Sequence, residues 1–301
     1  MSAPRPRAAV IINPVSGARG RRDEARLRAA QAAVMAERAG VDAEVFVTER
    51  AGHARDLARA ASARGASLVV AWGGDGTVNE VGSALAFGRV SLAIVPGGSG
   101  NGLARELGVP LDAAGALAVA FGGRDRPIDA GELDGRLFFN VAGVGLDAEV
   151  AHRFARGNGR RGLRRYVTAT GAALLAYRPP RVVVVAGGTA RSIRPLVVAI
   201  ANSRQYGNGA LIAPAARLDD GRLDLVVVEA RAPWKTAWAL PSLFTGRIAE
   251  APGVDVMAVE ALELRGEGPL LYHIDGEPFT GGPHLPGRVR PGALQVRVPA
   301  A

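Results

Sequence analysis

Short apolar segments alternate with alanine-rich helical segments over the first 130 residues, and this alternation limits the fold more than any other feature. The apolar runs Ala8–Ile12, Leu68–Trp72 and Leu92–Val95 each end at a turn that contains proline or glycine. Strands of a parallel sheet have this character, because both of their faces are covered. Strands separated by helices therefore predict an α/β domain with a parallel, doubly wound sheet, whose ligands bind at the carboxyl ends of the strands.

The remaining elements of this half follow from the same pattern. The apolar periodicity places Leu27, Ala30 and Val34 on one face of the first alanine- and arginine-rich segment, and this pattern predicts a helix. Besides the three strands above, we expect a strand over 41–47 and helices over 23–38, 52–63, 77–87 and 99–107.

From about residue 127 the pattern changes to strands that end in Gly or Asp-Gly turns, which is typical of an antiparallel β-sandwich. Helical pattern is confined to 148–177 and 233–244. We therefore expect an α/β domain over 1–127 and a β-rich domain over 128–301, whose last strand could return toward the first domain. The expected strands are 128–141, 181–186, 193–201, 223–229, 254–264, 270–274 and 294–298.

Composition excludes several kinds of chemistry. The 301 residues include no cysteine, so there is no disulfide, cysteine nucleophile, iron–sulfur cluster or cysteine-bound zinc. The four histidines lie far apart, which argues against a sequence-local metal site. Lys235 is the single lysine and lies in no glycine-rich loop, which excludes the P-loop and protein-kinase solutions to phosphate binding.

The net charge of +9 indicates an anionic partner, which could be nucleic acid, a membrane surface or a phosphorylated ligand. Nucleic acid is the weakest of the three, because no basic cluster is interleaved with aromatic side chains that could stack on bases. The start of the chain lacks the apolar core of a signal peptide, and no run is long enough to span a membrane. We expect a cytoplasmic protein.

The most informative motif is Gly73-Gly74-Asp75-Gly76-Thr77-Val78-Asn79-Glu80 at a strand-to-helix junction. Three glycines let the backbone approach an anion, and the amides of the helix start favour phosphate. Asp75 would repel a phosphate, so it suits a role in holding Mg²⁺ or in accepting a proton from an attacking hydroxyl. The simpler interpretation is a glycine-rich turn with aspartate as helix N-cap.

Two further turns share this character. The first strand ends at 13–17 (NPVSG), and a later strand ends at 96–102 (PGGSGNG). Either turn alone is weak evidence, because Gly, Asn, Pro and Ser favour turns in general. Together the three turns predict a nucleotide-phosphate cradle, built without lysine, at one edge of the sheet.

The chain contains six motifs, in the order NPVSG, GGDGTVNEV, PGGSGNGLA, FFNVAGVGLDAEV, APAARLDDGRLDL and IDGEPF. Together and in this order they resemble the motifs of the diacylglycerol kinase catalytic-domain family. That family includes soluble bacterial lipid kinases, sphingosine kinases and ceramide kinases. The resemblance covers essentially the whole chain. The GGDGT element alone is shared with NAD kinases and phosphofructokinases.

The resemblance implies an active site in the cleft between the two domains, with ATP as phosphate donor and Mg²⁺ as cofactor. Thr48 enters only through the resemblance, because by itself it resembles a helix N-cap. The implied ATP-binding residues are Asn13, Pro14, Ser16, Gly17, Thr48, Gly73, Gly74, Asp75, Gly76, Thr77, Glu80, Ser99 and Asn101.

Three acidic residues compete for the catalytic roles. On sequence alone Asp275-Gly276 is a hairpin turn. In the bacterial diacylglycerol kinases the matching Glu, here Glu277, is the proposed proton acceptor, and Asp275 would then support Mg²⁺. In the sphingosine kinases the base is the residue matching Asp75. We favour Glu277 as the base, with Asp75 on the Mg²⁺ of ATP.

The resemblance implies two further sites. Asp147 matches an acidic residue that contacts the lipid head group in sphingosine kinases, although locally it suits the N-cap of a helix starting at Ala148. Asp220, with the backbone carbonyls of Arg217 and Arg222, matches a structural Mg²⁺ site of the bacterial members, although Asp-Asp-Gly is also a common turn.

Six arginines lie within the segment Arg153–Arg165, directly before an apolar stretch. Each exposed arginine near an anionic leaflet contributes about 1 kcal/mol of attraction. A solvated basic helix is the ordinary explanation, but for a kinase whose substrate lies in a bilayer, docking at the inner face of the membrane is the better hypothesis. Two tryptophans in 233–244 form a second candidate for this contact. A homodimer is compatible with the sequence but not indicated by it.

The acceptor is left open by one departure from the family pattern. Bacterial diacylglycerol kinases typically carry aspartate where this chain has Gly102, and the GSGN form is similar to that of sphingosine kinases. Diacylglycerol, phosphatidylglycerol, a sphingoid base and ceramide all stay candidates. The alternatives are a soluble-metabolite kinase of the NAD kinase type and a non-catalytic lipid- or nucleotide-binding relative.

Overall fold

The computed structural model describes residues 5–16, 22–156, 177–230 and 241–300. Contacts divide the chain into two compact units, and each is described by itself. The first unit comprises Met1–Ile128 and Gly292–Ala301, and the second comprises Asp129–Pro291. The sequence places the boundary after residue 127 and leaves the return of the last strand open. In the contact division, the end of the chain belongs to the first unit.

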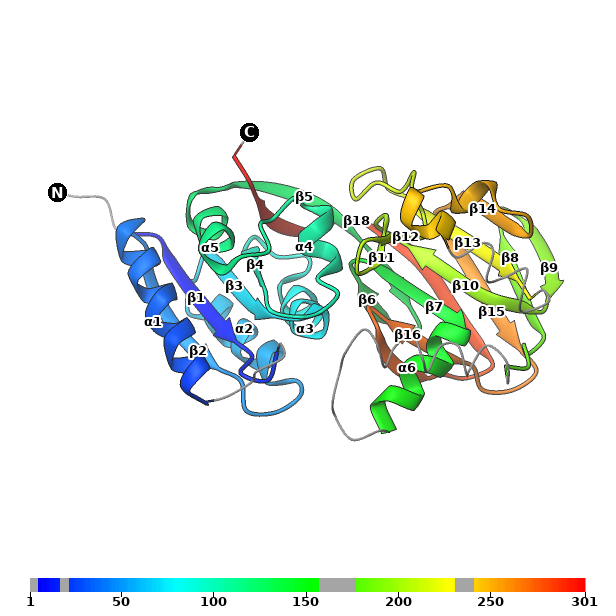
Figure 1. Cartoon of the computed structure of the whole chain (residues 1–301), viewed down its shortest axis with the longest axis horizontal. Helices are drawn as coiled ribbons and strands as arrows, with labels where there is room; N and C mark the ends of the chain where they lie inside the picture. Colours follow the sequence, from blue (N-terminus) through cyan, green and yellow to red (C-terminus); the bar gives the residue numbers. More distant parts are fainter. Residues whose placement is uncertain (1–4, 17–21, 157–176, 231–240, 301) are drawn as a thin grey trace. The chain divides into compact units, whose positions relative to one another are not determined.

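The first unit contains the predicted parallel sheet, with the strand order β2-β1-β3-β4 (Figure 1). The final part of strand β18 adds to this sheet, because Val296 pairs in parallel with Leu92 of β4. The strands are β1 (Arg7–Ile12), β2 (Asp42–Val47), β3 (Leu68–Gly73), β4 (Ser91–Pro96) and β18 (His284–Val298).

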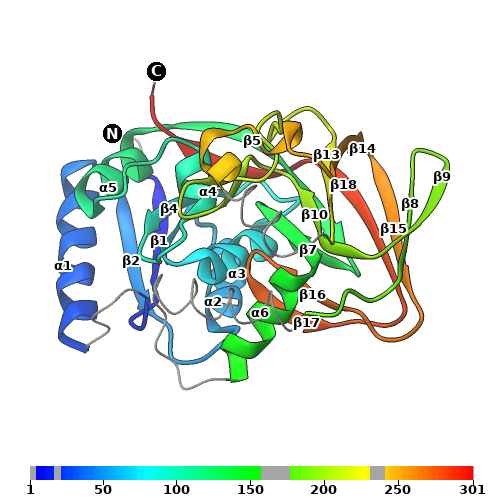
Figure 2. The same cartoon turned by 45° about the vertical axis from the view of Figure 1, so that its right-hand side comes forward.

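Helices cover both faces of this sheet, as a doubly wound fold requires. Helix α1 contacts α5, and α2 contacts α3. Figure 2 shows α1 on one side of β1 and β2, with α2 and α3 on the other. Helix α3 begins two residues before the predicted start, α4 is shorter than predicted, and α5 was not predicted. The helices are α1 (Arg22–Arg38), α2 (His53–Ala63), α3 (Asp75–Leu85), α4 (Gly102–Glu106) and α5 (Ala113–Gly122).

The predicted helix over 23–38 is present as α1, and its buried face is formed by alanines. Leu27 is 72% exposed and Val34 is 50% exposed, whereas Ala25, Ala32 and Ala36 are buried. Alanine has no side chain beyond Cβ, so a stripe of alanines lets a helix lie close to a sheet. The larger apolar residues of the helical pattern, Leu27 and Val34, therefore lie on the exposed side of this helix.

The second unit contains a six-stranded sheet in the order β14-β13-β10-β7-β16-β17, with antiparallel neighbours throughout. A second antiparallel set in this unit joins the first part of β18 to β15, β8 and β9. The strands are β7 (Val141–Gly145), β8 (Val182–Ala186), β9 (Thr189–Ile193), β10 (Pro195–Ala201), β13 (Leu223–Glu229), β14 (Val254–Val259), β15 (Ala261–Gly266), β16 (Leu271–Ile274) and β17 (Glu277–Thr280).

Smaller elements complete the chain. A short hairpin, β11 and β12, has no further strand neighbour among the described residues. No described helix is long and apolar enough to cross a membrane. These elements are β5 (Arg124–Leu133), β6 (Arg136–Phe138), β11 (Gln205–Gly207), β12 (Ala210–Leu211), helix α6 (Leu146–Arg156) and the 3-10 helix η1 (Ile248–Glu250).

Two predicted strands are wrong in extent, because each is interrupted. The segment predicted as one strand over 128–141 is the hairpin β5-β6, which turns at Asp134 and Gly135, both with positive φ. The predicted strand over 254–264 is broken into β14 and β15, which join different sheets. In both segments the interruption takes only one or two residues, Asp134-Gly135 and Glu260, so the strand pattern resumes almost at once.

Predicted helical segments are only partly within the described residues. The helix expected from 148 begins earlier, since α6 covers Leu146–Arg156. Residues 157–176 and 231–240 lie outside the described residues, so the rest of this helix and most of the one expected at 233–244 cannot be compared. The strand predicted at 294–298 is the end of β18, which begins at His284.

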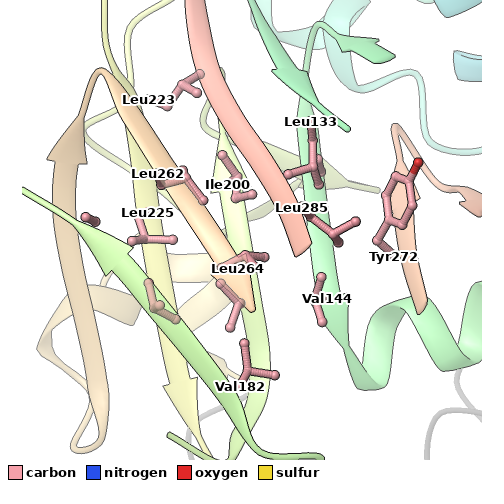
Figure 3. Packing of buried hydrophobic residues seen from close by; sticks show 14 of the residues in the cluster. Leu133, Val144, Val182, Ile200, Leu223, Leu225, Leu262, Leu264, Tyr272 and Leu285 are labelled. Carbon is pink, nitrogen blue, oxygen red and sulfur yellow. The ribbon is translucent and has the colours of Figure 1, made fainter. Parts of the chain in front are cut away.

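The core of the second unit lies between its two antiparallel strand sets (Figure 3). Apolar side chains from the six-stranded sheet, such as Ile200 and Leu225, meet side chains such as Leu262 and Leu264 of β15. This arrangement confirms the predicted sandwich.

Replacing Leu264 by alanine is expected to lower the free energy of unfolding by about 2–5 kcal/mol, because the side chain is fully buried in this core. Denaturant unfolding followed by circular dichroism would measure the loss. Leu27→Ala is the matched control: its side chain is mostly exposed, so we expect a change below about 0.5 kcal/mol. A loss as large in the control would contradict the packing of α1 described above.

Candidate active site

Three turns lie side by side at the carboxyl edge of β1, β3 and β4, where the sequence predicts the phosphate cradle. The backbone joins them directly: Asn13 N–H donates to the Trp72 carbonyl at 2.9 Å, and Gly97 N–H donates to the Gly73 carbonyl at 2.8 Å. Parallel strands bring their carboxyl ends to the same edge, so turns far apart in the sequence meet here.

Side chains also fix the first turn. The Asn13 Nδ2 group donates to Thr77 Oγ1 at 2.9 Å, and Asn13 Oδ1 accepts the Val15 N–H at 3.1 Å. Ser16 Oγ donates to the Asn13 carbonyl at 2.8 Å. Asn13 therefore links the NPVSG turn to the GGDGT motif. Pro14 lies in this turn, and Gly17 lies outside the described residues.

Arg28 is a residue of this site that the sequence did not single out. Its guanidinium donates to Ser16 Oγ and to the Ser16 carbonyl, both at 3.2 Å, and pairs with Glu24 at 2.6 Å. It also lies over the Trp72 ring, 5.8 Å from the ring centroid. Only 11% of its side chain is exposed. In the sequence, the feature that could have pointed to Arg28 is its spacing of four residues from Glu24. Such acid–base pairs are common on solvated helices, so the spacing does not identify a site residue.

The glycines of the other two turns permit close backbone approach. A Cβ atom on Gly98 would lie 2.7 Å from the Gly74 Cα, and one on Gly73 would lie 2.5 Å from Thr77 Oγ1. A Cβ on Gly100 would lie 2.7 Å from Asp75 Oδ2. Gly74 and Gly98 thus lie backbone against backbone at the start of α3, while Gly73 and Gly100 leave room for the side chains of Thr77 and Asp75. Closely packed glycine turns at a helix start are a common place for phosphate to bind.

Asp75 connects the two glycine-rich turns through its carboxylate. Oδ2 accepts the Asn101 N–H at 3.0 Å, and Oδ1 accepts the Gly102 N–H at 2.8 Å. Burial raises the pKa of Asp75 above its usual value, and these two amides only partly oppose that effect. The helix N-cap is Gly74, so the simple N-cap interpretation of Asp75 is wrong. The carboxylate retains acceptor positions that suit a cation.

Asn101 shapes its own turn. The residue has φ of 51°, its Oδ1 accepts the Gly98 N–H at 2.9 Å, and its Nδ2 donates to the Gly98 carbonyl at 2.8 Å. Arg105 Nε adds a bond to the Gly100 carbonyl at 3.1 Å. Asn tolerates the left-handed conformation better than most residues. The exposed Ser99 lies at the tip of this turn.

Glu80 and Thr48 hold the backbone near this edge. Glu80 Oε1 accepts the Gly52 N–H at 2.8 Å, and Oε2 accepts the Ala54 N–H at 3.1 Å, so Glu80 caps the start of α2 from α3. Thr48 is buried after β2, and its N–H donates to the Ile12 carbonyl at 2.9 Å. The local N-cap interpretation of Thr48 is wrong, because α2 begins at His53 after Gly52.

Replacing Glu80 by glutamine is expected to lower the free energy of unfolding by about 1 kcal/mol, because the amides at the start of α2 lose an anionic acceptor. Thermal unfolding would measure this loss. Glu37→Gln on the exposed end of α1 is the control and should leave the melting temperature nearly unchanged. Equal shifts in both variants would contradict the capping role.

The acidic pair of the second unit lies at the turn between β16 and β17. Asp275 and Gly276 have φ of 47° and 84°, and Ile274 pairs with Glu277. This confirms the predicted hairpin turn, since a two-residue turn with both φ values positive is the common hairpin connection. The exposed Glu277 is the first residue of β17.

The Asp275 carboxylate fixes the connection from β6 to β7. Its Oδ2 accepts the Phe139 N–H at 3.0 Å, and its Oδ1 accepts the amides of Asn140 and Val141 at 2.9 and 3.1 Å. The FFNV motif and the IDGE motif, far apart in sequence, are therefore one structural unit. Three amide donors occupy most of the acceptor capacity of Asp275.

Asp147 lies within the first turn of α6, and its side chain is only 7% exposed. Oδ1 accepts the Ala148 N–H at 2.8 Å, while Oδ2 accepts the Tyr206 hydroxyl at 2.6 Å and lies 2.9 Å from His273 Nε2. The local prediction of a helix starting at Ala148 is wrong, because α6 begins at Leu146. The sequence did not identify the two partners, since neither carries a recognisable motif.

The turn proposed for a structural cation carries several carboxylates. Asp220 Oδ1 accepts the Arg222 N–H at 3.1 Å, and the Arg217 side chain lies 3.7 Å from Asp219. Burial, and then the negative charge of Asp220, raise the pKa of Asp224. A cation would relieve this like-charge repulsion. The described residues contain no group of three or more His, Asp or Glu side chains that could form a metal site, so such a cation would rely on carbonyl ligands.

Comparison with protein families matches both units. Residues 7–133 match the diacylglycerol kinase catalytic domain, and residues 140–298 match the YegS C-terminal NAD kinase beta sandwich-like domain. The chain belongs to the diacylglycerol kinase family. The predicted resemblance is confirmed, and the chain is an enzyme of this family of lipid kinases.

Curated relatives cover nearly the whole chain. A Pseudomonas aeruginosa protein named "Probable lipid kinase YegS-like" is 38% identical over 90% of this chain and 89% of its own. A Mycobacterium tuberculosis protein named "Diacylglycerol kinase" is 33% identical over 96% of this chain and 94% of its own. A solved structure of a diacylglycerol kinase from Bacillus anthracis superposes with a TM-score of 0.73 at 20% identity, over 97% of this chain and 96% of that one. That likeness shows the fold alone.

The predicted membrane-docking segment can be placed only at its start. Arg153 lies on α6, and its Nε donates to Glu149 at 3.0 Å, one turn earlier. The later arginines Arg160, Arg161, Arg164 and Arg165 lie outside the described residues, as do the tryptophans of 233–244.

Proposed function

We propose that this member of the diacylglycerol kinase family transfers the γ-phosphoryl group of ATP, with Mg²⁺, to the primary hydroxyl of a membrane lipid. The observation that carries the proposal is the joining of three glycine-containing turns at one sheet edge by Asp75, Asn13 and backbone bonds. Phosphoryl transfer depends mainly on positioning and on charge stabilisation, which such a cradle supplies.

In this proposal the nucleotide phosphates bind the amides of 74–77 and those of Ser99 and Gly100, while Asp75 and Asn101 hold these two turns in register. Mg²⁺, when bound, supplies positive charge at the transferred group. Asp75 is the ligand proposed for this ion. Arg28 keeps the NPVSG turn against β3.

Glu277 is the proposed acceptor of the hydroxyl proton. Its side chain is exposed at the start of β17, where a lipid hydroxyl can reach it, and it follows directly on the turn that Asp275 fixes through backbone amides. Asp275 then acts by fixing the turn that carries Glu277. A carboxylate close to a primary hydroxyl is the chemistry that phosphoryl transfer requires.

The lipid is proposed as diacylglycerol-like or sphingoid- or ceramide-like. An assay with γ-labelled ATP would test the proposal on mixed micelles of diacylglycerol, phosphatidylglycerol, sphingosine or ceramide, with NAD as the soluble control. We expect Mg²⁺-dependent label in one lipid class. Label in NAD and in no lipid would overturn the proposal in favour of a soluble-metabolite kinase.

Two accessory proposals complete this function. The segment Arg153–Arg165 is proposed to dock on the anionic inner face of the membrane, where the lipid substrate lies. A structural Mg²⁺ is proposed at Asp220 with the carbonyls of Arg217 and Arg222, supported by the repulsion between Asp220 and Asp224.

A further inference from the structure

A buried polar cluster in the second unit joins Asp147, for which the family resemblance implies a contact with the lipid head group, to His273 and Tyr206, which have no part in the function proposed so far. The side chains of His273 and Asp147 are 8% and 7% exposed, and they meet at 2.9 Å between Nε2 and Oδ2. Tyr206 completes the cluster by donating its hydroxyl to the same Asp147 oxygen at 2.6 Å. Buried polar groups are costly unless they are bonded, so this cluster is a specific construction and not a surface contact.

The hydrogen bonds of His273 determine its tautomer. The Gly276 N–H donates to His273 Nδ1 at 3.3 Å, so Nδ1 carries no proton. Nε2 then carries the ring proton and donates it to Asp147. Both ring nitrogens have partners, and the imidazole therefore connects the start of α6 to the turn between β16 and β17.

The Asp147 end of this connection is held firmly. Burial acts to raise the pKa of Asp147, but the imidazole of His273, the Tyr206 hydroxyl and the Ala148 amide outweigh it and leave that pKa below the usual value. The carboxylate is thus a fixed anionic acceptor, and it anchors the Nε2 side of the ring.

Gly143 on β7 makes room for this pair. A Cβ atom at this position would lie 2.5 Å from Asp147 Oδ2 and 2.8 Å from His273 Nε2. A larger residue would therefore separate the two groups. The strand, the start of the helix and the hairpin turn are all built around the same hydrogen bond.

We propose that His273 is a positioning residue for the phosphoryl transfer. Its Nδ1 accepts the Gly276 N–H and thereby fixes the turn that directly precedes Glu277. The inference rests on the proposed function, in which Glu277 accepts the hydroxyl proton. Gly276 immediately precedes Glu277, so a rotation of its peptide changes the direction of the Glu277 side chain. Small errors in the position of a reacting group lower turnover strongly.

Two substitutions separate the two bonds of the ring. In His273→Asn the amide oxygen takes the place of Nδ1 and can accept the Gly276 N–H, but nothing reaches Asp147. In His273→Gln the amide nitrogen takes the place of Nε2 and can donate to Asp147, but no acceptor faces Gly276. Each variant keeps one bond, so a merely structural role for the cluster does not predict that only one variant loses activity.

We expect His273→Gln to lower kcat by about ten- to hundredfold with the KM for ATP nearly unchanged, and His273→Asn to keep kcat within about threefold. In ¹⁵N-labelled protein the Gly276 amide should exchange with solvent faster in the Gln variant only. Wild-type kcat in the Gln variant, or an equal loss in the Asn variant, would overturn the proposal.

Two further measurements keep the test independent of folding and of the proposed base. Nitrogen chemical shifts of the wild-type imidazole should show a proton on Nε2 and none on Nδ1, and the reverse would overturn the proposal. Glu277→Gln is assayed in parallel: if it retains turnover, the proposed base is wrong, while the Gly276 exchange contrast still decides whether His273 holds the turn.

Discussion

Replacing Glu277 by glutamine is expected to lower kcat about 10²- to 10⁴-fold, since an amide cannot accept the proton of the lipid hydroxyl. The KM for ATP should stay within about threefold, because Glu277 is not among the residues of the cradle. The exposed position at the start of β17 means that the melting temperature should not change. The γ-labelled ATP assay with the preferred lipid gives both kinetic constants.

Glu267→Gln is the matched control for this variant. Glu267 is an exposed glutamate in the same unit, on the connection between β15 and β16. Its replacement removes the same charge and should leave kcat within about twofold. If Glu277→Gln keeps full turnover, the base assignment passes to Asp75, as in the sphingosine kinase pattern.

Replacing Asp75 by asparagine is expected to abolish measurable turnover and to weaken ATP binding by about tenfold or more. The change affects both the hydrogen bonds that hold the turn at 101–102 and the charge proposed to hold Mg²⁺. An asparagine side chain has one acceptor oxygen for the two amides of Asn101 and Gly102, and its NH₂ group would face the other N–H. It also removes the negative charge proposed to hold Mg²⁺. Isothermal titration with ATP and Mg²⁺ separates binding from turnover.

The stability of the Asp75→Asn variant should fall much less than its activity. Burial raises the pKa of Asp75, which means that the folded chain disfavours the charged form relative to the unfolded chain. A neutral side chain of the same shape removes that penalty while it loses one bond. A melting temperature lowered in proportion to activity would instead indicate that the residue acts only through folding.

Asp112→Asn provides the control in the same unit. Asp112 Oδ1 accepts the Gly115 N–H at 2.8 Å and caps α5, so this residue also bonds a backbone amide through a carboxylate. We expect a small loss of stability, below about 1 kcal/mol, and wild-type ATP affinity. Weak ATP binding in both variants would contradict a specific role for Asp75.

Local patterns in the sequence were sufficient for the fold class and for the family. Apolar runs of one strand's length identify the buried strands, because burial on both faces leaves no polar positions. The Asp275-Gly276 turn was predictable from local conformation. Its two residues both have positive φ, and Asp-Gly is one of the few pairs that adopt this conformation readily. The face of α1 was not predictable, because alanine packing depends on the closeness of the sheet and not on hydrophobicity.

The acidic residues show what the sequence motifs did not predict, namely the hydrogen-bond partners of each carboxylate. The sequence identifies Asp75, Asp275 and Asp147 by their motifs, but a motif does not say which amides a carboxylate bonds. In the structure Asp75 holds the turn at 101–102, Asp275 holds the connection at 139–141, and Glu80 caps α2. Each partner lies more than twenty residues away, on another element.

What the sequence determined by itself is therefore the fold class of each half, the three turns at one sheet edge and the chemical class of the residues in them, because these follow from local conformation and periodicity. Only the tertiary structure decided which side chains meet. Arg28 over Trp72 and the pair of His273 and Asp147 join elements whose separation in sequence carries no pattern. Contacts of this kind depend on how strands and helices pack, and packing is a property of the whole fold.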